Sequence, residues 1–241
     1  MPTTILDVSS YQTVSNYRCG SVYHMPDRYS TLRAQRRAET QRMIQAHAVR
    51  LFAERGYDAT TMTDVAEAAG VSPMTVYRHF PTKEDLVLVD QYGSLIAERI
   101  AASSAAQPLV RRIGGALVES STELTAGSRG PGLTADGQFL LARLRLMIST
   151  PALRAKHLDN HYVLQQAIVG ALGDDTTDPD AAFRAQAAAS ACLAAMHTAL
   201  VRWAEDDGRT ELPELIAEAL AAAFGEDILG AGPDIRTSGA G

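Results

Sequence analysis

The sequence predicts an all-α protein, and three features support this prediction. The composition is rich in Ala, Leu, Arg and Glu, aromatic residues make up 6% of the chain, and β-branched residues form few runs, a pattern typical of packed helices. From Thr31 onward, apolar residues recur at the three- and four-residue spacing of an amphipathic helix. Short breaks rich in Gly, Pro and Ser divide the remaining chain, and short connections are typical of antiparallel helices in a bundle.

Four helices are expected in the N-terminal part of this chain. The first spans residues 31–55, and a short amphipathic helix follows at 62–69, closed by Gly70. A second short helix, 72–80, begins with a Ser-Pro pair, because Ser caps a helix and Pro fits its first position. The next Pro-Thr pair breaks this helix and starts a longer one, 82–102.

The chain after residue 102 is expected to form five more helices. The breaks that separate them lie at residues 103–108, 126–132, 149–151, 173–179 and 207–208. The last two segments, 180–204 and 212–224, are rich in Ala, and small side chains let helices approach closely. These two helices are therefore expected to form a dimer interface, and an ordinary core is the alternative interpretation.

The charges are unevenly distributed along the chain. Its formal net charge is −6, yet residues 28–83 hold nine Lys or Arg against five Asp or Glu. Residues 84–241 hold twelve basic against twenty-one acidic residues. A basic module joined to an acidic body suits contact with nucleic acid through one part only, because phosphate contacts are local.

Several classes of protein are disfavoured by what the sequence lacks. Cys19 and Cys192 have neither the number nor the spacing of a disulfide framework or a zinc knuckle. No apolar stretch is long enough to span a membrane, and no signal peptide pattern is present. Hydrolase, metalloprotease and nucleotide-binding motifs are also missing. We expect a cytoplasmic protein with no membrane partner, no cofactor and no enzymatic activity, and a helical enzyme is the competing class.

The two short helices have the spacing of a helix-turn-helix. Ala66 is small enough for one helix to cross over it, and Gly70 supplies the positive φ of the turn. Four side chains are then expected to point inward and form a small core with Leu51 and Phe52 of the first helix, namely Val65, Val71, Val76 and Phe80. The opposite face of the second helix keeps five side chains suited to DNA, namely Met74, Thr75, Tyr77, Arg78 and His79.

The chemistry of this face suits readout of double-stranded DNA. Arg78 can donate two hydrogen bonds to a guanine edge, and Thr75 can bond a base or touch a thymine methyl group. Tyr77 and His79 can reach phosphate oxygens. Lys83 adds a cation at the start of the following helix, and Thr61 or Thr63 can serve a phosphate at the start of the first short helix.

Four linked motifs resemble the N-terminal signature of the TetR family. They are LFAERGYDATT at 51–61, VAEAAGVS at 65–72, VYRHF at 76–80 and KEDL at 83–86. The resemblance covers residues 36–90 and implies a homodimeric repressor that binds a short inverted-repeat operator. By position it assigns DNA contacts to Thr61, Ser72, Thr75, Tyr77, His79 and Lys83, while Pro73 and Met74 fill positions that vary within the family. We include both with Thr63 and Arg78 in the predicted interface.

A run of arginines precedes these motifs. Arg33, Arg36 and Arg37 could form a basic arm against DNA. The alternative is a solvated charged run, which is common in helices. We include Arg36 and Arg37 in the predicted DNA interface.

The C-terminal half resembles a TetR subgroup that includes mycofactocin-associated regulators. The resemblance rests on LRLMISTPALR at 144–154 and covers residues 139–172. It implies an apolar or acyl-type small-molecule effector. The residues expected to line a pocket for this effector are Tyr92, Phe139, Tyr162, Cys192, Met196 and His197, and each of them has plain core as its alternative.

A metal site is not expected. His157 and His161 lie one helical turn apart, the spacing of a metal-binding pair, with His197 as a candidate third ligand. The sequence offers no carboxylate or cysteine that completes the site. We therefore interpret these residues as partly buried or surface histidines, with metal sensing as the alternative.

The predicted architecture has four parts. A tail at 1–30 precedes a three-helix helix-turn-helix DNA-binding domain at 31–82, a helical ligand-binding and dimerisation domain at 83–229 and a second tail at 230–241. Met25 lies just before the first expected helix, so translation could begin there, with the upstream start rarely or never used. The expected mechanism is a repressor whose effector tilts the helix after the recognition helix and changes the separation of the two recognition helices, about 34 Å on DNA. An activator is the alternative.

Overall fold

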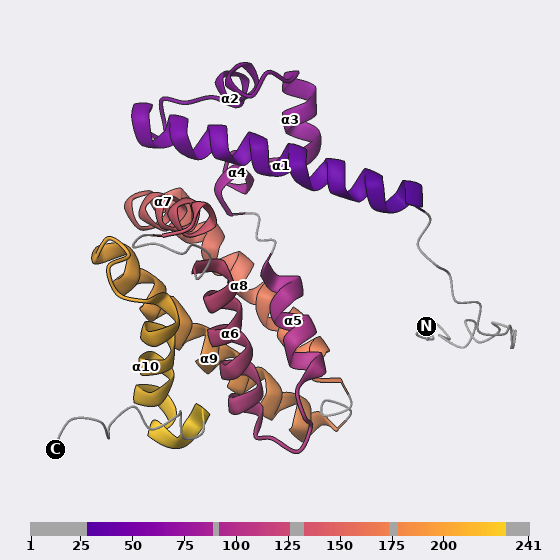
Figure 1. The fold of residues 1–241 in the computed structure, drawn as a ribbon, viewed down its shortest axis with the longest axis vertical. Helices are drawn as coiled ribbons and strands as arrows, with labels where there is room; N and C mark the ends of the chain where they lie inside the picture. The colour runs from indigo at the N-terminus through magenta and orange to yellow at the C-terminus, as the bar shows by residue number, and fades with distance from the viewer. Residues whose placement is uncertain (1–27, 89–91, 126–132, 174–177, 230–241) are drawn as a thin grey trace, which may run out of the picture. The chain divides into compact units, whose positions relative to one another are not determined.

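A computed structural model describes residues 28–88, 92–125, 133–173 and 178–229. Within these ranges all regular secondary structure is helical and no strand is present (Figure 1). The predicted all-α fold is therefore confirmed. Most of the two predicted tails, residues 1–27 and 230–241, lies outside the described residues.

The first four helices are α1 (Arg28–Arg55), α2 (Met62–Ala68), α3 (Pro73–His79) and α4 (Asp85–Leu88). α1 begins three residues before the expected start at Thr31. α4 and α5 together occupy the predicted helix 82–102, but residues 89–91 between them are outside the described residues. The continuity of that helix stays a prediction.

The five helices expected after residue 102 are all present. The rest of the chain forms α5 (Tyr92–Ala102), α6 (Leu109–Thr125), α7 (Ala135–Ser149), α8 (Pro151–Ala171), α9 (Pro179–Glu205), α10 (Leu212–Phe224) and a 3-10 turn η2 (Glu226–Leu229). None of the described helices is both long and apolar enough to cross a membrane.

Contacts divide the chain into two compact units, residues 1–39 and 40–241. The described part of the first unit is the N-terminal stretch of α1. The second unit holds the rest of α1 and all the other helices.

Apolar side chains of α1, α2 and α3 form the small core that the motif predicts. Phe52 from α1, Val65 from α2 and Val76 from α3 are fully buried, together with Phe80 just after α3. Val71, in the turn, is half-buried against the same core. Because each short helix contributes few apolar side chains, this shared core fixes how α2 and α3 cross.

α9 is the central helix of the following bundle, where it packs against α6, α7, α8 and α10. Its buried face carries small residues such as Ala185, Ala189 and Ala199, which let neighbouring helices approach closely. Trp203, the only tryptophan of the chain, is fully buried near its end. The same packing positions the cavity described below.

Candidate nucleic-acid interface and internal cavity

The turn between α2 and α3 has the geometry that the sequence predicts. Gly70 has φ +65, a conformation that a side chain would strain. The amide of Val71 donates to the carbonyl of Ala66 at 3.0 Å, which closes the turn. Ala66 is buried, so the small residue lies where the two helices meet.

Hydroxyl groups cap both short helices. Thr61 and Asp64 form a capping box at α2: the Asp64 amide donates to Thr61 Oγ1 at 3.1 Å, and the Thr61 amide donates to Asp64 Oδ2 at 2.7 Å. Ser72 Oγ accepts from the Thr75 amide at 3.1 Å at the start of α3, and Pro73 follows in the first helical turn. Thus Thr61, Ser72 and Thr75, three of the predicted DNA contacts, also fix the start of their helices.

The outward face of α3 has the predicted side chains. Met74 is 75% exposed and Tyr77 is 49% exposed, and Arg78 is exposed beside them. Thr75 and His79 are half-buried at the edges of this face. Three large side chains at spacings of three and four residues therefore share one exposed helical face.

Four further predicted DNA contacts lie on α1, on α2 and at the start of α3. Thr63 is exposed on α2, and Pro73 is exposed at the start of α3. Arg36 and Arg37 are exposed on the part of α1 that belongs to the first unit.

Lys83 is held at the start of α4 by aromatic rings. Its ammonium group lies 4.2 Å from the ring centroid of Tyr57 and 5.6 Å from that of Phe52, in the geometry of a cation–π contact. The Tyr57 hydroxyl donates to Glu84 at 3.0 Å. Burial and this hydrogen bond raise the pKa of Tyr57, so the phenol stays protonated and keeps donating to Glu84.

A cavity of about 380 Å³ lies among α4, α5, α7, α8 and α9. Most of its wall is apolar, including Leu140, Leu144, Met147, Leu164, Met196 and Leu200. The polar side chains in its wall include Asp85, Arg143, His157, Asn160 and His161. An apolar cavity with a few polar groups is the usual form of a small-molecule site.

Two cavity residues hold the end of α4. The Arg143 guanidinium on α7 donates to the carbonyl of Val87, and the Asn160 amide on α8 donates to the carbonyl of Leu88 at 3.0 Å. These carbonyls belong to the last two residues of α4. The cavity wall is thus bonded to the short helix that follows the helix-turn-helix.

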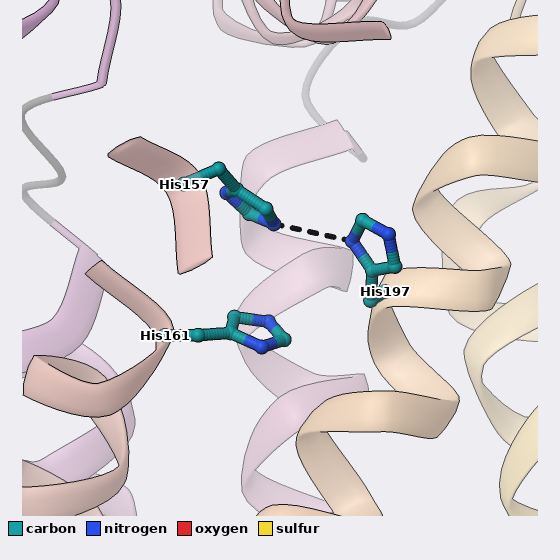
Figure 2. A group of neighbouring side chains, drawn as sticks. All are labelled: His157, His161 and His197. Carbon is teal, nitrogen blue, oxygen red and sulfur yellow. Dashed lines mark hydrogen bonds between the residues drawn. The ribbon is translucent and has the colours of Figure 1, made fainter. Parts of the chain in front are cut away.

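Three histidines meet at the cavity wall (Figure 2). His157 and His161 on α8 point toward His197 on α9, and His157 Nε2 lies 3.1 Å from His197 Nδ1. Burial, and then the neighbouring His161, His197 and Arg143, lower the pKa of His157 to about 4. Burial and His197 also lower the pKa of His161. His157 and His161 are therefore neutral near pH 7.

The residues predicted for an effector pocket lie in different surroundings. Met196 lines the cavity, and His197 belongs to the histidine group beside it. Phe139 is half-buried with the Arg143 guanidinium 5.7 Å from its ring centroid. Cys192 is fully buried, and burial raises the pKa of its thiol to about 12. Tyr162 is 64% exposed and is not in the cavity wall, and the side chain of Tyr92 lies outside the described residues.

Arg143 and Asn160 were not anticipated from the sequence. Each is a polar residue in a mixed stretch, where a solvated surface position is the usual interpretation. The helices that carry them have apolar residues on several sides. The sequence pattern therefore does not show which side of each helix faces the cavity.

Two family models match separate parts of the chain. The family model described as "Bacterial regulatory proteins, tetR family" matches residues 44–89, and the model described as "MftR C-terminal domain" matches residues 133–224. Together the two matches cover more than half of the chain.

Two curated relatives and one solved structure illustrate these matches. The HTH-type transcriptional regulator TcmR of Streptomyces glaucescens is 31% identical over 53% of this chain, and the match spans only 56% of TcmR. The mycofactocin biosynthesis transcriptional regulator MftR of Mycobacterium tuberculosis is 27% identical over 83% of this chain and 93% of that protein. The crystal structure of NalD, a repressor of a multidrug efflux pump in Pseudomonas aeruginosa, has a TM-score of 0.51 at 20% identity and covers 79% of this chain and 96% of NalD. This last similarity concerns the fold.

Proposed function

Because the chain belongs to the TetR family of transcriptional regulators, we propose that it is a cytoplasmic repressor that binds an inverted-repeat operator as a homodimer and is released by a small molecule. The observation that carries this proposal is the pair of hydrogen bonds from Arg143 and Asn160 to the end of α4. Both donors line the cavity. A ligand in the cavity can therefore act on the helix that follows the DNA-binding motif.

The exposed face of α3 is the part that reads DNA. Arg78 donates to a guanine edge, and Tyr77 and Met74 beside it contact the backbone and apolar base edges. Lys83 adds positive charge for phosphates, and Arg36 and Arg37 on the first unit are proposed to do the same. The other proposed contacts are Thr61, Thr63, Ser72, Pro73, Thr75 and His79. The strongly acidic remainder of the chain keeps the DNA contact local to this module.

Release requires ligand binding in the cavity to be energetically coupled to the conformation of α4. Two intramolecular hydrogen bonds contribute about 1–3 kcal/mol in total. This equals the usual coupling free energy between two allosteric sites, about 1–3 kcal/mol. A ligand that draws Arg143 or Asn160 away from the Val87 and Leu88 carbonyls loosens α4 and changes the position of α3.

The cavity chemistry favours an apolar effector with one polar or anionic end. Leu, Met and Ala side chains suit an acyl or other hydrocarbon group, and the Arg143 guanidinium and Asn160 amide suit a carbonyl or carboxylate. An effector bound there competes for the donors that hold α4.

The homodimer is formed through α9 and α10. Phe183 is 71% exposed on α9, and Ala187, Ala194 and Thr198 are exposed at spacings that continue the same face. Ala194→Arg should convert the dimer to a monomer in sedimentation analysis, whereas Ala101→Arg on α5 should leave it a dimer. A dimer that survives Ala194→Arg would contradict this interface.

DNA binding is tested by titrating the purified protein against the DNA that flanks its own gene, at two salt concentrations. Tyr77→Ala/Arg78→Ala should weaken binding about fivefold to more than a hundredfold, since one good base contact contributes about 1–3 kcal/mol. The control is Tyr162→Ala/Arg209→Ala, which removes the same two residue types from exposed positions of the body. A wild-type protein that selects no DNA from a random pool would refute the proposal, and a reporter that falls rather than rises on gene deletion would indicate an activator.

A further inference from the structure

The three histidines at the cavity wall belong to two helices and come together only in the fold. His157 and His161 lie one turn apart on α8, and His197 faces them from α9 (Figure 2). We propose that His157, His161 and His197 bind one divalent transition metal ion, of which Zn²⁺ is the representative, with its open coordination position bordering the cavity. The metal site does not depend on the proposed repressor function. Only the identification of a ligand at the open position with the effector rests on that proposal.

The distances fit this kind of ion. One nitrogen from each residue lies within 4.8 Å of the others, and the His157–His197 pair is 3.1 Å apart. With Zn–N bonds of about 2.0–2.1 Å, two tetrahedral ligand nitrogens lie about 3.3 Å apart. The His157–His197 pair, at 3.1 Å, is near that separation. Rotation of the imidazoles about their side-chain bonds brings in the third nitrogen.

One nitrogen of the group lacks a partner in the described part of the chain. His161 Nε2 is buried and has no hydrogen-bond partner among the described residues. A buried nitrogen with a free lone pair or N–H is costly, and coordination is one way to satisfy it.

The ligand atoms and the nearby charges together determine which metal ion is favoured. Arg143 lies near His157 and opposes any cation, while Asp85 in the same cavity wall has the opposite charge. Three neutral nitrogen ligands suit zinc, copper or nickel, whereas calcium and magnesium require oxygen ligands. With three protein ligands the ion keeps a position for water or an anionic group. His157 and His161 both line the cavity, so this position borders the space available to a ligand.

The alternative is that the three rings are a metal-free polar group. The 3.1 Å contact between His157 and His197 is then an ordinary hydrogen bond between neutral imidazoles. This arrangement satisfies one pair of nitrogens and leaves His161 Nε2 without a partner. The two interpretations differ in one measurable quantity, the affinity for zinc.

The test uses the full-length untagged protein, stripped of metal with a chelator, and titrates ZnCl2 by calorimetry and by competition with a chromophoric zinc indicator. We expect one ion per chain and a dissociation constant of about 1 µM or below. His161→Gln and His197→Gln should each weaken binding by more than the ~10–100-fold that follows loss of a partner outside the coordination sphere. His47→Gln, which removes a histidine of α1 outside the group, should leave zinc affinity unchanged. MgCl2 and CaCl2 should show no binding.

Cobalt substitution provides a spectroscopic readout that a folding defect does not imitate. Co²⁺ in the wild type should give strong visible bands typical of tetrahedral coordination, and these bands should be lost in His161→Gln while the far-ultraviolet circular dichroism stays unchanged. Zinc affinity equal in wild type and in the two variants, or no binding by wild type, would overturn the inference. Operator binding by the metal-free protein is measured separately, so failure of the metal site and failure of the repressor proposal give different results.

Discussion

The helix-turn-helix and the cavity are built from the chain in opposite ways. The exposed face of α3 comes from one seven-residue helix, and the turn before it depends on Gly70 and Ala66, a few residues away. The cavity wall draws residues from Asp85 to Leu200, and the contact between His157 in this wall and His197 beside it joins residues 40 positions apart. A local site leaves a motif in the sequence, whereas a site between distant helices leaves only scattered polar residues.

The largest expected effect concerns the link between the two regions. Arg143→Met/Asn160→Leu removes both side-chain donors to the end of α4. Operator affinity should fall about 5–150-fold without any effector, which corresponds to about 1–3 kcal/mol of coupling. Fluorescence anisotropy with a labelled operator measures this change.

The matched control removes the same residue chemistry from the same two helices. Arg145 on α7 pairs with Asp207, and Gln165 on α8 donates to Ser190 at 2.8 Å, so neither reaches α4. Arg145→Met/Gln165→Leu should leave operator affinity near that of wild type. Equal losses in the two double variants would mean that general loosening of the bundle, rather than the bonds to α4, controls DNA binding.

The limits of sequence-based prediction follow from the same contrast. The helices after residue 102 and the positive φ of Gly70 were predictable because helical periodicity and turn chemistry are local properties. The exposed face of α3 was predictable for the same reason. Arg143 and Asn160 were not, because α7 and α8 carry polar and apolar residues on several sides, and only the packing of α4 and α9 against them decides which face is inside.

The histidine group shows the limit most clearly. The i, i+4 spacing of His157 and His161 is visible in the sequence, but a third ligand on another helix is defined only by how α8 and α9 pack. The sequence named His197 as a candidate third ligand, and the argument against a metal rested on the lack of a carboxylate or cysteine to complete the site. The fold places His197 on α9 within 3.1 Å of His157.

A second pair of substitutions compares Gly70 of the helix-turn-helix with Gly170 of α8. Gly70→Ala puts a side chain at φ +65 in the turn, where the added Cβ meets nothing within 4 Å, so the cost is backbone strain of about 1 kcal/mol or more. Gly170→Ala on α8 also meets nothing within 4 Å and should stabilise the protein by about 1 kcal/mol, because Ala is the better helix former. Urea denaturation of both variants measures the two changes in unfolding free energy. Changes of the same sign would show that turn geometry does not distinguish the two positions.

The smallest expected effect is an acid dependence of stability that the helix-turn-helix and the helical bundle share. Hydrogen bonds from the Thr61 side chain and amide lower the pKa of Asp64 in the helix-turn-helix. The Thr210 hydroxyl, with nearby backbone amides, lowers the pKa of Asp206 after α9. A carboxyl group whose pKa is lower in the folded state stabilises the fold above its unfolded pKa, about 3.9, and this contribution is lost as the pH falls through the folded value.

Asp64→Asn and Asp206→Asn should therefore each be slightly less stable than wild type at pH 7, and each should lose less stability than wild type between pH 5 and about pH 3. Asp159→Asn, which removes an exposed carboxylate from α8, controls for the loss of one charge. Urea denaturation at each pH measures the slopes. Both interactions join residues three or four positions apart. Similar pH dependences of stability in the two variants would mean that local hydrogen bonds contribute alike in both parts of the protein. The two parts would then differ in their long-range contacts. If the pH dependence of stability changes in Asp64→Asn alone, the two parts of the protein already differ in their local capping interactions.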